Sequence, residues 1–225
     1  VKTLLKNPIV KPEIDEQGLY EIFLIGPGRT LGQGIYKNIK ELLPGEYAVY
    51  NGKKLTRKRY FTLKAREHTA DVYQTISDVR ELITDSIERQ LVSDVPLCCF
   101  LSGGLDSSII SYIAAKHNER KGMKPIDTYS IDYTDNEKYF QKSLFQPTPD
   151  SDFIGIMVDA IKSEHHSVTI DNYSLFEALI PAVDARSFPG MVDVDSSLLL
   201  FCKKIKEDFT VALSGECADE LFGGY

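Results

Sequence analysis

The chain has 225 residues, of which 43% are hydrophobic and 26% are charged, as is ordinary for a globular protein. Its net charge of −7 argues against a broad nucleic-acid surface, and no apolar run is long enough to cross a membrane. The length allows one α/β domain with a full core and one smaller unit. Four cysteines without zinc-ligand spacing, Cys98, Cys99, Cys202 and Cys217, indicate reduced thiols, so a cytoplasmic location is expected.

The N-terminal part of the chain predicts a small, β-rich unit. Residues 19–25 are mostly apolar and predict a strand, and the glycine-rich loop 26–34 follows them. Asn51-Gly52 between two strand-like runs is typical of a β-hairpin turn. The remaining expected segments are one short helical turn and the two hairpin strands: residues 35–43, 46–50 and 54–60.

From residue 71 onward the sequence alternates between expected helices and strands, which predicts a parallel sheet. Residues 71–91 carry apolar side chains every three or four positions, as an amphipathic helix does. The expected strands are residues 95–101, in which Cys98 and Cys99 should face opposite sides, and residues 126–131, 166–170 and 210–213. The later expected helices are residues 108–120, 153–163, 173–185 and one that Asp195-Ser196-Ser197 caps and that runs to Asp208.

Residues 132–152 carry few helical signals and contain Pro147 and Pro149, which is typical of a functional lid or a disordered loop. His165 and His166 lack a second metal ligand at suitable spacing, so we expect them to be polar residues at a strand edge. Cys217 lies in a tight polar segment, where a small filler at a turn is expected and a reactive thiol is the alternative.

A glycine turn without lysine follows the first buried strand. Its sequence is Ser102-Gly103-Gly104-Leu105-Asp106-Ser107-Ser108, and its glycines allow successive backbone N–H groups to face one concavity. The start of the next helix adds unpaired N–H groups and a positive dipole end, so the segment predicts a phosphate nest. Asp106 stands where the common P-loop has lysine, and we therefore expect Mg2+ between this carboxylate and the phosphate.

A second polar segment follows the last predicted strand. Its sequence is Leu213-Ser214-Gly215-Glu216-Cys217-Ala218-Asp219-Glu220-Leu221-Phe222-Gly223-Gly224-Tyr225. Because ligands bind at the carboxyl ends of parallel strands, we expect both polar segments to border one cleft. If residues 216–219 form one helical turn, Glu216 and Asp219 share a face, where a cation would relieve their repulsion.

The first segment resembles the pyrophosphate loop of the ATP pyrophosphatases, and the second is similar to the Ser-Gly-Glu-x-x-Asp-Glu-x-Phe-Gly-Gly-Tyr signature of B-type glutamine-dependent asparagine synthetases. This resemblance implies an adenine nucleotide α-hydrolase-like α/β domain over residues 63–225. Gly26-Pro27-Gly28-Arg29-Thr30, residues 35–41 and Pro44-Gly45-Glu46-Tyr47 resemble the end of that family's N-terminal-nucleophile glutaminase domain. Residues 1–62 are therefore interpreted as a glutaminase remnant, which should not hydrolyse glutamine because Val1 stands in place of the nucleophilic cysteine.

The same resemblance implies a ligase of asparagine biosynthesis that amidates aspartate through β-aspartyl-AMP and releases AMP and pyrophosphate. ATP, Mg2+, aspartate and glutamine-derived ammonia are the implied ligands; no nucleic acid or membrane is implied, and a homodimer is compatible with it. The implied pyrophosphate ligands are Ser102, Gly103, Gly104, Ser107 and Ser108, and the implied nucleotide contacts are Leu101, Ile131, Ser214 and Gly215. The implied Mg2+ ligands are Asp106 and Asp219, and the implied catalytic residues are Glu216 and Asp219.

Several interpretations stay open at this point. A β-lactam synthetase-like enzyme or another ATP-pyrophosphatase amidotransferase would carry the same pyrophosphate loop. A nucleotide-binding module without catalysis is an alternative from a different class, although it has no need for three acids near phosphate. The first segment alone could also be a glycine turn with a serine and aspartate cap. Because the family's chains are longer, we expect this chain to be a fragment cut at both ends, with impaired activity.

Overall fold

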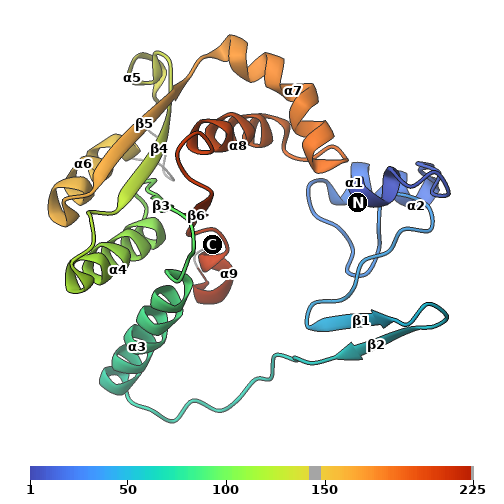
Figure 1. Ribbon diagram of the computed structural model, residues 1–225, viewed down its shortest axis with the longest axis horizontal. Helices are drawn as coiled ribbons and strands as arrows, with labels where there is room; N and C mark the ends of the chain where they lie inside the picture. The colour runs from blue at the N-terminus through green and yellow to red at the C-terminus, as the bar shows by residue number, and fades with distance from the viewer. Residues whose placement is uncertain (142–147, 224–225) are drawn as a thin grey trace. The chain divides into compact units, whose positions relative to one another are not determined.

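The computed structural model describes residues 1–141 and 148–223, and it divides into two compact units (Figure 1). One unit comprises Val1–Thr69 and Glu177–Ser196, and the other comprises Ala70–Phe176 and the chain from Ser197 onward. Within the described ranges, none of the helices combines the length and hydrophobicity that a membrane span requires.

The N-terminal part of the first unit consists of short elements. They are α1 (Lys2–Leu5), α2 (Glu16–Tyr20), the π-helix η1 (Glu21–Ile25), β1 (Glu46–Tyr50) and β2 (Leu55–Arg59). The hairpin predicted around Asn51-Gly52 is confirmed, because β1 and β2 pair antiparallel with Tyr50 opposite Leu55. Its strands are largely exposed, so this hairpin contributes little to a core.

Two sequence predictions for this unit are wrong. Residues 19–25 are helical, because Asp15 caps α2 by accepting a hydrogen bond from the Gly18 N–H at 3.0 Å. A short, mostly apolar segment without strict alternation fits a helix as well as a strand, which explains the error. Residues 35–43 form no helix; Tyr36 instead makes an isolated antiparallel bridge with Ile14.

The second unit contains the predicted parallel sheet. Its strands are β3 (Leu97–Phe100), β4 (Asp127–Tyr133), β5 (Glu164–Ile170) and β6 (Val211–Leu213). Their order is β5-β4-β3-β6, and all neighbouring pairs are parallel, with Cys98 opposite both Asp127 and Ala212. The chain therefore leaves β3 toward one edge of the sheet and returns to its other side at β6.

Helices cover both faces of this sheet (Figure 1). Cys98 packs with Tyr129, Phe201 and Ile205, the last two from α8 (Val192–Ile205), whereas Cys99 packs on the opposite face with Ala114 of α4 (Leu105–Lys121). The helices in chain order are α3 (Val72–Gln90), α4 (Leu105–Lys121), α5 (Asn136–Tyr139), α6 (Asp150–Ile161), α7 (Asn172–Arg186), α8 (Val192–Ile205) and α9 (Ala218–Phe222). The opposite orientation predicted for the two adjacent cysteines is thus confirmed.

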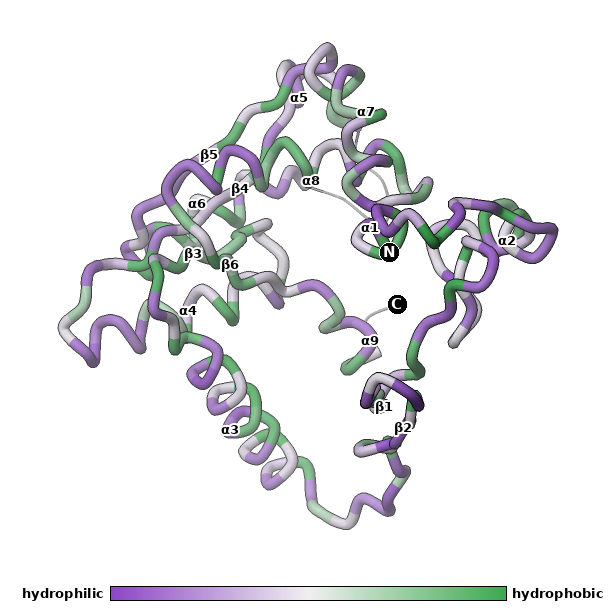
Figure 2. The backbone as a smooth tube through the Cα atoms, turned by 45° about the vertical axis from the view of Figure 1, so that its right-hand side comes forward, coloured by the Kyte–Doolittle hydropathy of each residue, from purple (hydrophilic) through white to green (hydrophobic). Residues whose placement is uncertain are grey.

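The amphipathic helix predicted at residues 71–91 is confirmed as α3, along which hydrophobic and hydrophilic residues alternate in Figure 2. The helix predicted to begin after a cap at Asp195-Ser196-Ser197 starts earlier, at Val192. Asp195 is not free to cap, because its Oδ1 pairs with Arg186 Nη1 at 2.5 Å.

The segment expected to be irregular at residues 132–152 is partly ordered into regular structure. β4 continues to Tyr133, α5 follows, and α6 begins at Asp150 behind Pro149. A proline directly before a helix and acids in its first turn both indicate a helix start. The sequence interpretation instead took the two prolines of this segment as signs of irregular structure. The part of this expectation that falls on residues 142–147 lies outside the described residues.

Candidate functional site

The two polar segments follow adjacent strands of the sheet. Ser102 follows β3 and Ser214 follows β6, so both lie at carboxyl ends of parallel strands. β3 is also where the strand order reverses, since β4 lies on one side of it and β6 on the other. In open α/β sheets ligands bind at this kind of switch point.

In the loop after β3, one of the two glycines has a backbone conformation that other residues rarely adopt. Gly103 has a φ of +83°, and a Cβ added there would lie 2.7 Å from the Asp150 carbonyl oxygen of α6. Gly104 precedes α4 in extended conformation, and α4 runs for 17 residues. Its first-turn N–H groups have no partner within the helix and lie next to Asp106, which is itself in that turn.

The approach of α6 to this loop was not expected from the sequence. Besides the Asp150 carbonyl, Phe153 Cβ would lie 3.2 Å from a Cβ at Gly103. Gly103 is therefore required both by its φ and by a neighbouring helix. The available signal was the start of α6 at Pro149-Asp150, which the sequence interpretation placed inside an irregular segment.

Serine hydroxyl groups form hydrogen bonds within this loop. The Ser107 side chain is buried, with 6% of the residue exposed, and its Oγ lies 3.0 Å from Ser102 Oγ. Ser107 also donates to the Gly104 carbonyl at 3.1 Å and accepts from the Ser102 N–H at 3.2 Å. Leu101, with 1% exposed, fixes the end of β3 through its N–H bond to the Tyr129 carbonyl at 2.8 Å.

The second segment reaches the first through Gly215. A Cβ added at Gly215 would lie 3.0 Å from Asp106 Cβ and 3.1 Å from the Ser107 backbone nitrogen. Ser214 Oγ accepts a hydrogen bond from the Glu216 N–H at 3.3 Å, which shapes the turn that follows. The structure thus brings Gly215 of the second segment next to Asp106 and Ser107 of the first.

Glu216 and Asp219 are not arranged as the helical-turn hypothesis expects. Glu216 lies in a turn before α9, and Cys217 follows it with a φ of +70°. α9 begins only at Ala218 and has Asp219 in its first turn. The left-handed residue between the two acids breaks the helical spacing, so they do not share one helix face. Gly224 and Tyr225 of this segment lie outside the described residues.

The donor set near the loop fits a hard cation that phosphate oxygens also hold. Asp106 is partly exposed at the start of α4, and carboxylate oxygens are preferred Mg2+ ligands. Over residues 1–141 and 148–223 no group of three or more His, Cys, Asp or Glu side chains is close enough to hold a metal alone. A site that consists of Asp106, Asp219 and phosphate oxygens needs only two protein ligands, and it stays a prediction.

Ile131 and Ser108, two further residues predicted to contact the nucleotide or pyrophosphate, lie in apolar surroundings. Ile131 lies in β4 and packs partly buried against the core cluster of Cys98 and Phe201. Ser108 lines a cavity of about 670 Å³ together with apolar residues of α3 and α4. Their predicted roles toward adenine and pyrophosphate stay predictions.

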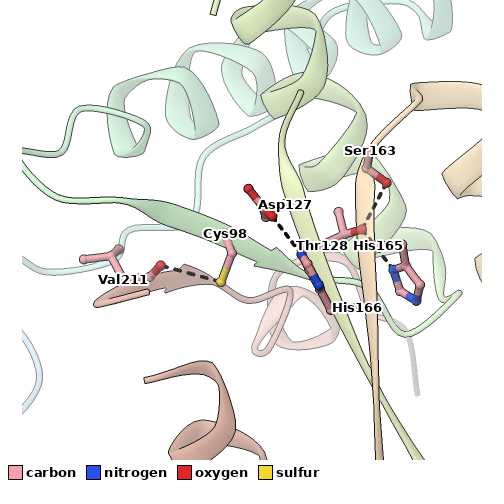
Figure 3. A network of polar contacts seen from close by, with 7 residues as sticks. All are labelled: Cys98, Asp127, Thr128, Ser163, His165, His166 and Val211. Atoms are coloured by element: carbon pink, nitrogen blue, oxygen red, sulfur yellow. Dashed lines mark hydrogen bonds and ion pairs between the residues drawn. The ribbon is translucent and has the colours of Figure 1, made fainter. Parts of the chain in front are cut away.

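The two histidines lie near the start of β5, which is the edge strand on the other side of the sheet from β6 (Figure 3). His166 Nε2 pairs with Asp127 Oδ1 at 2.8 Å, and its ring stacks on Tyr129 with centroids 4.6 Å apart. His165 lies between the Thr128 and Ser130 hydroxyls, each 3.0 Å from a ring nitrogen. Burial lowers the pKa of His165, and the nearby His166 lowers it further.

Burial disfavours the thiolate form of Cys98, Cys99 and Cys202. Burial raises the pKa of Cys98 to about 12 and that of Cys99 to about 12. Burial also raises the pKa of Cys202, next to the charge of Glu216. Cys217 is exposed at the left-handed turn before α9, which agrees with a residue that shapes a turn.

Comparison with known proteins finds the same family by its family model and by its curated relatives. The family model described as asparagine synthase matches residues 78–225. Asparagine synthetase [glutamine-hydrolyzing] 3 of Bacillus subtilis (strain 168) is 50% identical over 225 residues, which are 100% of this chain and 37% of that protein. Asparagine synthetase [glutamine-hydrolyzing] 1 of the same organism is 29% identical, over 95% of this chain and 31% of that protein.

A human asparagine synthetase [glutamine-hydrolyzing] is 25% identical, over 84% of this chain and 36% of that protein. Among solved structures, an NAD+ synthetase from Burkholderia pseudomallei is 12% identical with a TM-score of 0.36, over 69% of this chain and 57% of that one. The chain therefore spans about a third of the length of these curated relatives, 37%, 31% and 36% of the three proteins.

Proposed function

Because the chain belongs to the asparagine synthase family, we propose that the intact protein amidates aspartate to asparagine with ATP, using ammonia derived from glutamine. The reaction would proceed in two steps. The aspartate side-chain carboxylate attacks the α-phosphorus, which gives β-aspartyl-AMP and releases pyrophosphate. Ammonia then displaces AMP from the activated carboxyl group and leaves asparagine.

The observation that carries this proposal is the close approach of Gly215 to Asp106 and Ser107. A Cβ at Gly215 would lie 3.0 Å from Asp106 Cβ and 3.1 Å from the Ser107 nitrogen. One loop has the donors for a departing pyrophosphate, and the other carries acids after an adjacent strand. Such a constellation acts mainly by positioning and charge neutralisation, which is what phosphoryl and adenylyl transfer require of a protein.

Roles are proposed residue by residue. Ser102, Gly103, Gly104 and Ser108 hold the β- and γ-phosphates, while Leu101, Ile131, Ser214 and Gly215 contact the nucleotide. Asp106 and Asp219 hold Mg2+, and Glu216 assists the formation or breakdown of the adenylate. Bound Mg2+ supplies charge compensation for the phosphates. Ser107, also predicted to hold pyrophosphate, is considered separately below.

The N-terminal part is proposed to be a remnant of a different domain. Residues 1–62 would derive from the end of a glutaminase domain, and residues 63–225 would be an adenine nucleotide α-hydrolase-like domain. The largely exposed β1–β2 hairpin supports this, because two strands alone rarely form a stable sheet and a glutaminase layer would supply partners.

The test measures pyrophosphate release from ATP by the natural protein that contains these 225 residues. We expect release that requires aspartate, and AMP and asparagine once ammonia is present. Asp106→Ala should lower the rate at least about 100-fold, because removal of a group that stabilises transition-state charge costs this much. Asp94→Ala, which removes an exposed aspartate outside both loops, should leave it unchanged.

Three outcomes would contradict the proposal. Release that depends on another carboxylate acceptor would favour a β-lactam synthetase-like or other amidotransferase activity. ATP binding without pyrophosphate release would favour a nucleotide-binding module. Equal rates for Asp106→Ala and the wild type would remove the cation-bridged loop from the mechanism.

A further inference from the structure

Ser107 is the most enclosed hydroxyl of the loop after β3. Only 6% of the residue is exposed, whereas Ser102 is exposed and Ser108 is partly exposed. Its Oγ has three neighbours at hydrogen-bond distance: the Gly104 carbonyl at 3.1 Å, the Ser102 nitrogen at 3.2 Å and Ser102 Oγ at 3.0 Å. All three neighbours belong to the loop itself.

The loop leaves the Ser107 hydroxyl no hydrogen to donate to a phosphate oxygen. Its only hydrogen has two acceptors within reach, the Gly104 carbonyl and Ser102 Oγ, and both belong to the loop. The Ser102 N–H donates to one lone pair of Ser107 Oγ. A phosphate oxygen could bind Ser107 only if one of these bonds broke, and the group left unpaired would be costly.

The bonds of Ser107 also determine where the rest of the loop points. The Gly104 carbonyl accepts from both the Ser107 hydroxyl and the Ser108 N–H at 3.1 Å, so this acceptor stays folded back into the start of α4. A carbonyl turned the other way would present negative charge to a phosphate. The two bonds from Ser102 to Ser107 likewise hold the exposed Ser102 at the mouth of the loop.

We infer that Ser107 is a positioning residue that shapes the pyrophosphate loop through Ser102 and Gly104 and does not itself bind pyrophosphate. The inference rests on the proposed function for the identity of the ligand. It corrects the sequence-based expectation for Ser107 alone and keeps the expectation for its neighbours. The residue type needed at this position is one with a small buried hydroxyl that both donates and accepts.

The experiment is a double-mutant cycle in the natural protein. Ser107→Ala, Ser102→Ala and the double variant are compared by the KM for ATP in pyrophosphate release and by direct titration with inorganic pyrophosphate and Mg2+. If Ser107 acts through Ser102, Ser107→Ala weakens both by about tenfold, as loss of about one hydrogen bond does. The double variant should then be no weaker than Ser102→Ala, because the two effects are not independent.

Two further variants separate positioning from general destabilisation. Ser107→Thr retains the hydroxyl and should recover most of the lost affinity. Ser111→Ala removes another fully buried hydroxyl one turn along the same helix, beyond the glycine loop, and should change thermal stability without changing the KM for ATP. A fall in stability without a change in KM for Ser107→Ala would overturn the inference.

Multiplicative effects of the two serine substitutions would also overturn it, because they would show an independent contact of Ser107 with the phosphate. A wild-type protein that binds pyrophosphate but releases none from ATP would refute the proposed function, and the pyrophosphate titration would still decide the role of Ser107. A wild-type protein that binds no pyrophosphate would overturn both.

Discussion

Gly215 has no room for a side chain beside the start of α4. A Cβ there would lie 3.0 Å from Asp106 Cβ, 3.1 Å from the Ser107 nitrogen and 3.3 Å from the Asp106 carbonyl carbon. Gly215→Ala should therefore push the two loops apart by a few tenths of an ångström and cost about 1–3 kcal/mol of stability. We expect the loss in ATP-binding free energy to be larger than this loss in stability. Calorimetric titration with ATP measures the first, and thermal unfolding measures the second.

Gly155→Ala is the matched control for this substitution. Gly155 lies in α6, and a Cβ added there has no neighbour within 4 Å. Alanine is the better helix former, so this variant should be neutral or more stable by up to about 1 kcal/mol. Equal ATP affinity for Gly215→Ala and the wild type would mean that the close approach of the loops has no part in binding.

His165 should make the stability of the second unit fall in acid. Burial lowers its pKa below the ordinary value of 6.5, so the unfolded chain binds the proton more readily than the folded one. The contribution of neutral His165 to the free energy of unfolding is complete above the ordinary pKa of 6.5. It is lost as the pH falls from there through the lower pKa of the folded state. The free energy of unfolding, measured by urea titration between about pH 7.5 and about pH 4.5, should decrease over this range.

His165→Asn removes the titrating ring, so its unfolding free energy should fall less steeply with acid, although it is less stable at neutral pH because Thr128 or Ser130 loses a partner. His117→Asn, on α4 and away from this network, should keep the wild-type slope. Identical slopes for the wild type and His165→Asn would contradict the assignment.

The residue types of the site could be predicted from sequence, but their hydrogen-bond partners could not. The glycine turn and its acid follow from the pattern of Ser102 to Ser108 after an apolar strand. Whether a serine in that pattern faces a ligand or the loop depends on backbone angles such as the φ of +83° at Gly103, which the pattern does not specify. This is why Ser107 and Ser102 look equivalent in sequence and differ in burial.

At the level of single elements, α3 depends on one side-chain cap. Asp71 accepts a hydrogen bond from the Gln74 N–H at 2.9 Å, while its carbonyl accepts the Thr75 N–H at 2.9 Å. Asp71→Ala should therefore lower the free energy of unfolding by about 1 kcal/mol, the usual cost of losing an N-cap. Chemical denaturation followed by circular dichroism measures this loss.

Asp71→Asn separates the cap from the charge. An amide oxygen caps nearly as well as a carboxylate, so this variant should lie within a few tenths of a kcal/mol of the wild type, apart from the small contribution of the acid to the helix dipole. If Asp71→Ala were as stable as Asp71→Asn, the cap seen at Gln74 would not stabilise α3.

Elements with a strong local sequence pattern could be predicted, whereas elements with a weak pattern could not. The amphipathic period of α3, the glycine that ends α4 with a φ of +62° and the apolar run of β3 each point to one structure. The run at residues 19–25 has no period, so its helical state depends on the Asp15 cap and on the buried Glu21 carboxylate, which accepts from the Thr30 N–H at 2.7 Å. Contacts of this kind leave no periodic trace in a sequence.

At the scale of the whole molecule, the first of the connections between the two units has no regular secondary structure. Residues 60–70 belong to no helix or strand, and residues 60–69 are exposed. Each unit has its own contacts, so the connection can be accessible to a protease while both remain folded. Lys64 and Arg66 lie in this segment, and they are the trypsin sites that we expect to be cleaved first.

Limited trypsin digestion under native conditions, followed by intact-mass measurement, checks this expectation. The first products should end at Lys64 or Arg66, because a protease needs several extended, exposed residues and the helices and the sheet hide theirs in hydrogen-bonded structure. Replacing both residues by glutamine should slow the first cleavage about tenfold or more without changing thermal unfolding, since neither side chain is buried. First cleavage inside α3 or α4 would instead mean that the second unit opens more readily than the connection does.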